Sequence, residues 1–220
     1  MRSRPPISLL GALTAASLLH CAPALAQERE IQKPYMAAKL MLGLGGEVET
    51  ETPAGTAEDD LELSWGAGLQ YMARLHSHFA LGALLGFQSW QSDVRDDLDL
   101  DRNVLVDFAV VPAGMFAVSG EVELYVALGL GLSMDFVGDD EVNEGGALVG
   151  ADIDEAIGFA LLPVIGARFA VSRDVGLLAE LGYALHSYEH EAEGTVAGVT
   201  ATTDFHLSLG QLALNLGVFF

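Results

Sequence analysis

The last seventeen residues of the sequence, Asp204 to Phe220, have the pattern of one amphipathic strand and end on an aromatic side chain. Counting back from Phe220 by twos gives only apolar residues, which are Val218, Leu216, Leu214 and Leu212. The positions between them are mostly small or polar, namely Phe219, Gly217, Asn215, Ala213 and Gln211. A period of two places the two sets on opposite faces of a strand. The segment therefore predicts a long amphipathic β-strand with one continuous apolar face.

Seven further segments alternate in the same way. They are Tyr35 to Gly46, Leu61 to Arg74, Phe79 to Ser92, Arg102 to Met115, Glu121 to Met134, Ala156 to Val171 and Val175 to Tyr188. In the second of them Leu61, Leu63 and Trp65 are assigned to the apolar face, and bulges are expected at Pro112 and Pro163. The faces opposite the apolar ones carry many glycines and few charges, which disfavours a soluble β-sandwich. We therefore predict an all-β fold, a closed antiparallel eight-stranded up-and-down transmembrane β-barrel.

The composition agrees with a barrel. Apolar residues make up 51% of the chain and the mean hydropathy is +0.36, yet no apolar stretch after Leu25 is long enough for a spanning helix. Residues 1–26 have the layout of a cleaved secretory signal peptide, with Arg2 and Arg4 before an apolar run and Ala24-Leu25-Ala26 at the cleavage site. Residues 27–220 would form the barrel domain. Lipid attachment at Cys21 is the alternative, which His20 disfavours. The net charge of -21 argues against nucleic acid as a partner.

The connections between these segments alternate in length. Short ones lie near 75–78, 117–120 and 172–174, and long ones span Glu47 to Asp60, Gln91 to Asp101, Asp135 to Glu155 and Glu189 to Thr203. Outer-membrane barrels have short periplasmic turns and long external loops, so the long connections are expected outside the cell. With Asp204 included, they hold 23 of the chain's 31 acidic residues. We expect weak binding of divalent cations there, without a dedicated metal site, because Arg102 and Phe108 break the EF-hand pattern that starts at Asp97.

The two faces of the strands predict two sets of site residues. Outward aromatic side chains should form girdles at the two membrane surfaces, with Trp65, Phe87, Phe108, Phe159 and Tyr183 at the external level and Tyr71, Phe79, Phe169 and Phe220 at the periplasmic level. Inward charged side chains should form a network in the lumen, made of Lys39, Glu62, Arg74, Asp107, Glu123, Arg168 and Glu180. Buried charges need partners, and the interior of an eight-stranded barrel is only wide enough for side chains. A paired polar core is therefore favoured over an ion path.

The signal peptide, the alternation, the loop asymmetry and the terminal Leu216-Gly217-Val218-Phe219-Phe220 resemble the small outer-membrane barrels of the outer-membrane protein A and X type. The resemblance implies residence in the Gram-negative outer membrane, contact with its lipids and lipopolysaccharide, and recognition of the strand ending in Phe220 by the barrel-assembly machinery. The expected role is non-enzymatic, structural or surface-interacting, and without a cofactor. A narrow, porin-like channel for small solutes is the alternative.

A remoter alternative is an enzyme. The chain is similar in size to the lipid A deacylase barrels, whose His-x-Ser pair and acid lie on the lipid-facing wall. His206 and Ser208 have this spacing and the outward parity, which matches the nucleophile and base of such a site. Gln211 and Asn215 stand where a downstream carboxylate would be needed, so two small polar residues at the headgroup level are the favoured interpretation. His186 and His190 flank the fourth long connection and are expected to carry no chemistry.

Overall fold

The structure is a computed structural model, which describes residues 34–53, 55–91, 103–136, 140–144, 147–153, 155–196 and 199–220. The signal peptide predicted over residues 1–26 and most of the second long connection lie outside the described residues. Among the described residues, no helix is long and apolar enough to cross a membrane.

The described residues form ten β-strands. They are β1 (Tyr35–Thr52), β2 (Gly55–His76), β3 (Phe79–Trp90), β4 (Asn103–Ala117), β5 (Val122–Phe136), β6 (Asp140–Glu144), β7 (Ala147–Ile153), β8 (Ala156–Ala170), β9 (Gly176–Val196) and β10 (Val199–Phe219). Eight of them, all except β6 and β7, match the eight segments predicted from the alternation.

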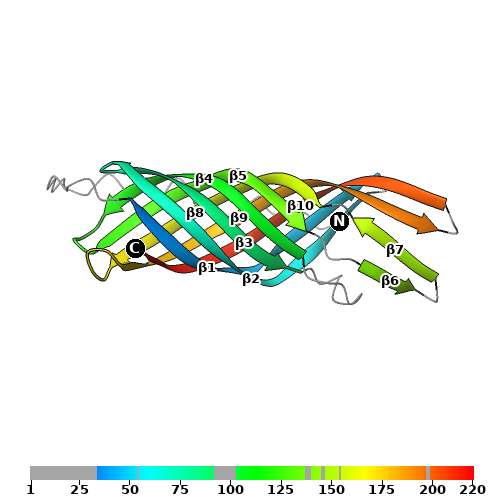
Figure 1. Ribbon diagram of the computed structural model, residues 1–220, viewed down its shortest axis with the longest axis horizontal. Helices are drawn as coiled ribbons and strands as arrows, with labels where there is room; N and C mark the ends of the chain where they lie inside the picture. Colours follow the sequence, from blue (N-terminus) through cyan, green and yellow to red (C-terminus); the bar gives the residue numbers. More distant parts are fainter. Residues whose placement is uncertain are drawn as a thin grey trace, which may run out of the picture. The chain divides into compact units, whose positions relative to one another are not determined.

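These eight strands close into a ring. Each strand from β1 to β4 pairs antiparallel with the next, β5 pairs with β8, β8 with β9, and β9 with β10 (Figure 1). The ring closes because β10 also pairs with β1, from Ala37 opposite Phe219 to Glu51 opposite His206. The backbone ends of this seam are joined directly, since Met36 N donates to Phe220 O and Phe220 N donates to Met36 O. The predicted closed, eight-stranded, up-and-down barrel is confirmed.

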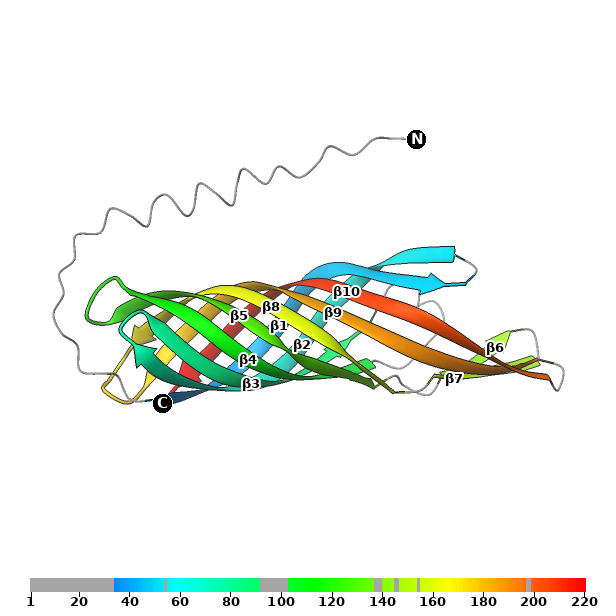
Figure 2. The same ribbon diagram turned by 90° about the horizontal axis from the view of Figure 1, so that it is seen from above.

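The long connections contain more regular structure than the sequence predicted. The stretch Glu47 to Asp60 was expected to be a loop, but β1 and β2 stay paired through it, up to Thr52 opposite Gly55. The stretch Glu189 to Thr203 likewise continues β9 and β10, and β6 and β7 form a hairpin beside β9. Figure 2 shows these hairpins running on beyond the ring at one end. Val48, Thr50 and Thr52 favour an extended backbone at the end of β1. Where the structure describes the long connections, their acidic residues therefore lie mainly on strands.

One β-bulge changes which side chains face the lumen. The β1–β10 register slips between Gly43 and Gly46, and Gly45 has a φ of 103°, a left-handed conformation that glycine adopts without strain. Val48 beyond the bulge faces inward. On β2, Leu61 is 6% exposed and Leu63 is 66% exposed, so the assignment of Leu61 to the lipid face is wrong. The bulges expected at Pro112 and Pro163 are also absent, because the register continues unchanged across both residues.

The outer wall of the ring is apolar. Along β5, for example, Leu124, Val126, Leu128, Leu130 and Leu132 are all exposed, and the intervening positions face the interior. Inward glycines leave room for large interior side chains, since a Cβ on Gly82 or Gly166 would collide with Met72 or Tyr125. A wall of this kind is stable only against lipid.

We expect the folded protein to resist SDS until it is heated. A closed barrel satisfies its backbone hydrogen bonds within the sheet, so detergent has no free edge in the ring from which to begin unfolding. Unheated and boiled samples should therefore migrate differently in SDS gels. Identical migration of the two samples would contradict the closed ring.

Candidate functional site

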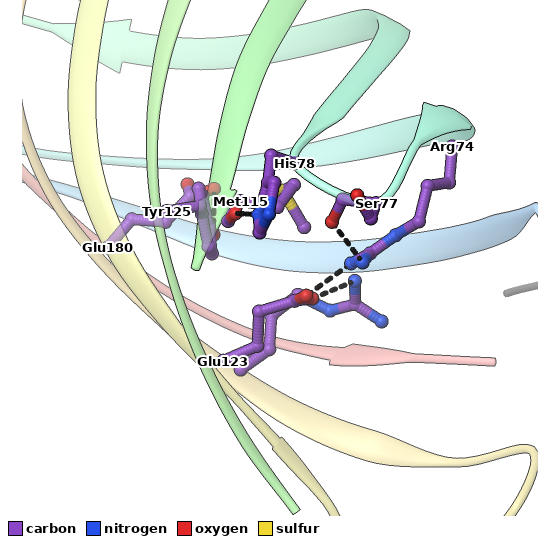
Figure 3. Close-up of polar contacts among 8 residues, drawn as sticks. Arg74, Ser77, His78, Met115, Glu123, Tyr125 and Glu180 are labelled. Carbon is purple, nitrogen blue, oxygen red and sulfur yellow. Dashed lines mark hydrogen bonds and ion pairs between the residues drawn. The ribbon is translucent and has the colours of Figure 1, made fainter. Parts of the chain in front are cut away.

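The periplasmic end of the lumen holds a buried charge cluster around Glu123 on β5. Arg74 from β2 and Arg168 from β8 both donate to its carboxylate, and the Arg168 Nη1–Glu123 Oε2 distance is 3.1 Å. Figure 3 shows Arg74 also reaching the backbone oxygen of Ser77 in the β2–β3 turn. The guanidinium carbon of Arg168 lies 3.9 Å from the ring centre of Tyr35, a cation–π contact. These side chains occupy the periplasmic end of the lumen, which is called its lower end below.

We expect Arg168→Met to lower the free energy of unfolding by about 1.5–3 kcal/mol, the range for a hydrogen bond to a charged group. The loss of stability should be smaller than when a buried charge loses its only partner, because Arg74 remains beside Glu123. Urea unfolding in lipid vesicles, followed by tryptophan fluorescence, measures it. Arg173→Met in the exposed β8–β9 turn is the matched control. A loss as small as the control's would mean that this end of the lumen is hydrated.

A second cluster surrounds Glu180 on β9. Lys39 Nζ from β1 lies 2.7 Å and 2.8 Å from the two carboxylate oxygens, Tyr125 Oη from β5 donates to Oε1 at 2.6 Å, and Asn215 Nδ2 from β10 donates to Oε2 at 2.9 Å. Four strands thus converge on one carboxylate. The pairing and the hydrogen bonds together offset the cost of taking these charges out of water.

A third cluster lies higher in the lumen and includes two histidines on β9. His186 Nε2 lies 3.1 Å from Asp107 Oδ1 on β4, and His190 Nε2 lies 3.3 Å from Asp135 Oδ2 on β5. Ser133 Oγ donates to Asp107 at 2.5 Å. Beside them Gln88 Nε2 donates to Ser64 Oγ and to Gln211 Oε1. Polar side chains from most of the ring therefore meet across this level.

An apolar layer packs around the upper histidine level. Its buried members are Val48, Leu61, Trp90, Leu105, Ala156, Tyr188, Leu207 and Leu209. The cavity lower in the lumen, lined by Lys39, Asp107 and Glu180 among others, has a volume of about 40 Å³. Since about 10–15 Å³ of such space holds one water molecule, this cavity has room for a few. Side chains therefore occupy much of the described interior, with a small polar cavity between the clusters.

The structure places six of the seven charged residues predicted for the lumen in these clusters, namely Lys39, Arg74, Asp107, Glu123, Arg168 and Glu180. It does not place Glu62 with them. Leu61 and Ser64 both face inward, so the alternation slips by one between them and Glu62 is only half-buried. Sequence reasoning missed Asp135, which was assigned to an external connection, and His186 and His190. Their inward parity on the extended β5 and β9 strands was the available signal.

The predicted girdle aromatics all point outward. Phe87, Phe108 and Phe159 lie toward the predicted external ends of their strands, and Tyr71, Phe79, Phe169 and Phe220 lie toward the predicted periplasmic ends. Trp65 lies in the middle of β2 and Tyr183 lies nearer the Gly176 end of β9, because both strands continue beyond the predicted segments. Each of the nine side chains is at least 41% exposed. Aromatic rings prefer the interface between acyl chains and headgroups. The assignment of these aromatic residues to two membrane girdles stays a prediction.

On the outer wall, the structure brings His206 and Ser208 of β10 together with Ser187 of β9. His206 Nε2 lies 3.2 Å from Ser208 Oγ and 3.3 Å from Ser187 Oγ. The two serines line an outward groove of about 360 Å³, with Phe159, Leu161, Tyr183 and Leu185 among its apolar residues and Glu47, Glu49 and Glu58 among its acidic ones. In the register, Glu51 and Glu189 are the partners of His206 on the two flanking strands.

The strand extensions above the external girdle carry closely spaced acids. On β1 and β2, Glu47 is opposite Asp60, and Glu49 is opposite Glu58. Like charges directly opposite one another destabilise a strand pair. Among the described residues, no three or more His, Cys, Asp or Glu side chains lie together in a way that could hold a metal ion.

We expect millimolar calcium or magnesium to protect these extensions from proteases, and monovalent salt to do so in part, because both reduce repulsion between the carboxylates. Limited proteolysis of the refolded protein across a titration of each ion measures this. The periplasmic turns serve as internal controls. If neither divalent ions nor monovalent salt changes the cleavage rate, the repulsion is unimportant, and saturation by micromolar calcium alone would reveal a dedicated site.

Comparison with known proteins supports the fold. No family model matches the sequence, and no curated relative matches it. Among solved structures, the chain is similar to the outer membrane protein OprG from Pseudomonas aeruginosa, with a TM-score of 0.58, 8% identity and coverage of 86% of this chain and 98% of that one. It is also similar to the outer membrane protein AlkL in lipid bilayers, with a TM-score of 0.50, 16% identity and coverage of 90% and 96%.

A third similar structure is the outer membrane protease OmpT from Escherichia coli, with a TM-score of 0.52, 9% identity and coverage of 88% of this chain and 99% of that one. The closed ring, the apolar wall and these similarities together define the fold as a transmembrane β-barrel of the kind seen in outer-membrane proteins. Barrels of this fold differ widely in activity, so the function has to be argued from the lumen and the wall.

Proposed function

We propose that this chain is a non-conducting, non-enzymatic barrel of the cell envelope that holds an acidic β-surface outside the cell. The observation that carries the proposal is the packed lumen. Three polar clusters, centred on Glu123, Glu180 and Asp107, cross the interior at successive levels, and an apolar layer packs around the uppermost. Such an interior stabilises the barrel and leaves no continuous aqueous path.

The proposal includes the partners expected from the sequence. Residues 1–26 would direct export and be removed. The β10 strand ending at Phe220 would be read by the barrel-assembly machinery, and the apolar wall would contact outer-membrane lipids, with lipopolysaccharide beside the acidic extensions. The surface-interacting role would belong to the paired hairpin β1–β2 and to the hairpins β9–β10 and β6–β7, because strands present fixed charges better than mobile loops do.

Single-channel recording in planar bilayers at about pH 6 tests the non-conducting role against the alternative of a narrow channel. Protein shown to be folded by its heat-dependent migration should give no current steps. Regular steps proportional to the salt concentration would establish a pore and overturn the proposal. The Arg168→Met variant serves as a comparison in the same recordings. If side-chain packing blocks the lumen, weakening the Glu123 cluster should increase the ionic current above that of the wild-type protein.

A second candidate function is hydrolysis of a lipid ester on the outer wall, favoured by the contacts of His206 with Ser208 and Ser187. In such a reaction His206 would accept the proton of one serine hydroxyl as its oxygen attacks the ester carbonyl, and the ester C–O bond would break as the alcohol leaves with that proton. Water would then attack the acyl-serine, which releases the fatty acid and restores the serine hydroxyl. The orienting carboxylate, which Gln211 and Asn215 do not supply, would come from a neighbouring strand, with Glu51 and Glu189 as the register partners of His206.

Release of fatty acid from vesicles containing lipopolysaccharide or phospholipid tests this second function. Turnover that is abolished by Ser208→Ala and kept by Ser187→Ala would assign Ser208 as the nucleophile, and the converse would assign Ser187. Absence of release by the folded wild-type protein would reject the hydrolase and leave the three side chains as a polar contact at the headgroup level.

A further inference from the structure

The outward groove beside His206 has an apolar side and an acidic side. Two rows of register partners cross it from β8 towards β1 and β2. The first row consists of Leu161, Leu185, Gly210 and Glu47. The second row consists of Phe159, Ser187, Ser208, Glu49 and Glu58. All of these residues line the groove. It is therefore mainly apolar on β8 and β9, acidic on β1 and β2, and built from small residues on β10.

Gly210 gives the groove its depth. It lies between Glu47 and Leu185 in the first row and carries no side chain. The phenol of Tyr183 lies over it, since a Cβ on Gly210 would be 2.6 Å from Tyr183 Oη. The volume of about 360 Å³ is at the lower end of the roughly 300–1,000 Å³ typical of small-molecule sites. The groove can therefore hold part of a lipid, namely a segment of acyl chain beside its headgroup.

The acidic side of the groove has no lysine or arginine among the described residues. The described lysines and arginines are Lys39, Arg74 and Arg168 in the lumen and Arg173 in the β8–β9 turn. None of them lines the groove. The carboxylates that are opposite one another on β1 and β2 repel each other. A cationic ligand would relieve this repulsion, whereas an anionic ligand would add to it.

We propose that the groove binds a membrane lipid whose headgroup carries a primary amine. Its acyl chain lies against the apolar side on β8 and β9, and its ammonium group donates hydrogen bonds to the carboxylates of Glu47, Glu49 and Glu58. An ammonium group has three donors and carboxylates are acceptors, and hydrogen bonds between charged partners are the strong ones. The site is independent of both candidate functions above, because binding needs neither a closed lumen nor turnover of an ester.

Native mass spectrometry of the full, folded protein in detergent micelles tests the site. The probes are phosphatidylethanolamine, phosphatidylcholine and phosphatidylglycerol with identical acyl chains, at about pH 8, where imidazoles are ordinarily neutral. A chelator removes divalent ions that could bridge an anionic headgroup to the carboxylates. The first bound phosphatidylethanolamine should be favoured over phosphatidylglycerol by about tenfold, as expected for one hydrogen bond to a charged group. Phosphatidylcholine, which has the charge but no N–H donor, should bind less well than phosphatidylethanolamine.

Equal binding of phosphatidylethanolamine and phosphatidylglycerol, or a preference for phosphatidylglycerol, would overturn the proposal. Equal binding of phosphatidylethanolamine and phosphatidylcholine would overturn the requirement for a primary amine. Because the measurement detects binding alone, none of these results bears on the conductance of the barrel or on hydrolysis.

Two variants locate the site. The triple change Glu47→Gln, Glu49→Gln and Glu58→Gln should abolish the preference for the amine lipid. Its matched control neutralises three exposed acids that do not line the groove, by the changes Glu121→Gln, Glu155→Gln and Asp174→Asn, and should keep the preference. Gly210→Leu fills the groove and should weaken binding of the first lipid whatever its headgroup. Heat-dependent migration checks that each variant is folded. If Gly210→Leu does not fold, the triple variant decides, and a preference that survives in it would overturn the proposal.

Discussion

Replacing Lys39 with methionine is expected to lower the free energy of unfolding by about 3–5 kcal/mol, the usual cost of leaving a buried charge without its partner. Lys39 is the cation of the Glu180 cluster, and both side chains are almost fully buried. Tyr125 and Asn215 would still donate hydrogen bonds to Glu180, but neither carries a positive charge. Urea unfolding of the protein in lipid vesicles, followed by tryptophan fluorescence, gives the difference.

The double variant Lys39→Met with Glu180→Leu separates the lost pair from lost packing. Replacing both members of a buried ion pair by apolar residues is often neutral or stabilising, so the double variant should recover much of the stability lost in Lys39→Met. If the double variant is instead less stable than the single one, the charge of Glu180 is not what destabilises the single variant. Arg173→Met controls for the loss of a cation at an exposed turn.

The second large effect is expected for Glu123→Leu. This change leaves the guanidinium groups of Arg74 and Arg168 together at the lower end of the lumen without their shared acid. The expected loss is about 3–5 kcal/mol, and it should exceed the loss in Arg168→Met, which keeps one complete pair. Glu121→Leu is a matched control, because Glu121 lies two residues away and is exposed. Equal unfolding free energies for the Glu123 and Glu121 variants would contradict the cluster.

The sequence allowed the ring to be predicted because its main signal is local. A period of two within a strand can be recognised without knowledge of the neighbouring strands. It places Glu123 of β5, Arg168 of β8 and Glu180 of β9 on the inward face, where the structure has them buried. The same parity assigned Arg168 and Glu123 to one lumen network, and the structure pairs the two residues.

The errors arose where the alternation alone was insufficient. The bulge at Gly45 and the slip near Glu62 move Val48 and Leu61 to the inside, and a one-residue slip reverses every side chain beyond it. The acidic composition of the extensions suggested loops, although cross-strand pairing keeps them extended. The predicted segments ended at Tyr188 and Met134, before the ends of β9 and β5. His190 was therefore assigned to a loop, and its partner Asp135 to a connection outside the barrel.

The outer-wall groove shows a further limit of sequence reasoning. A search for an acid downstream of Ser208 on the same strand finds Gln211 and Asn215, both of which are buried in the lumen. The carboxylates nearest in register to His206 are Glu51 of β1 and Glu189 of β9. Glu51 lies more than a hundred positions before His206 in the sequence. Which residues meet on a barrel wall depends on register, which a single strand does not specify.

The central claim, that side chains seal the lumen, is tested most directly by the accessibility of a cysteine placed inside it. In a Cys21→Ser background the chain has no other cysteine, and Ala184→Cys adds one sulfur to a buried position in the middle of the lumen. Glu51→Cys and Arg173→Cys, exposed at opposite ends of the barrel, are the accessible controls. At about pH 6, a charged, water-soluble thiol reagent should modify both controls quickly and leave Cys at position 184 unmodified until the protein is unfolded. Modification at position 184 at a rate close to that of the controls would show a water-filled lumen and contradict the sealed barrel.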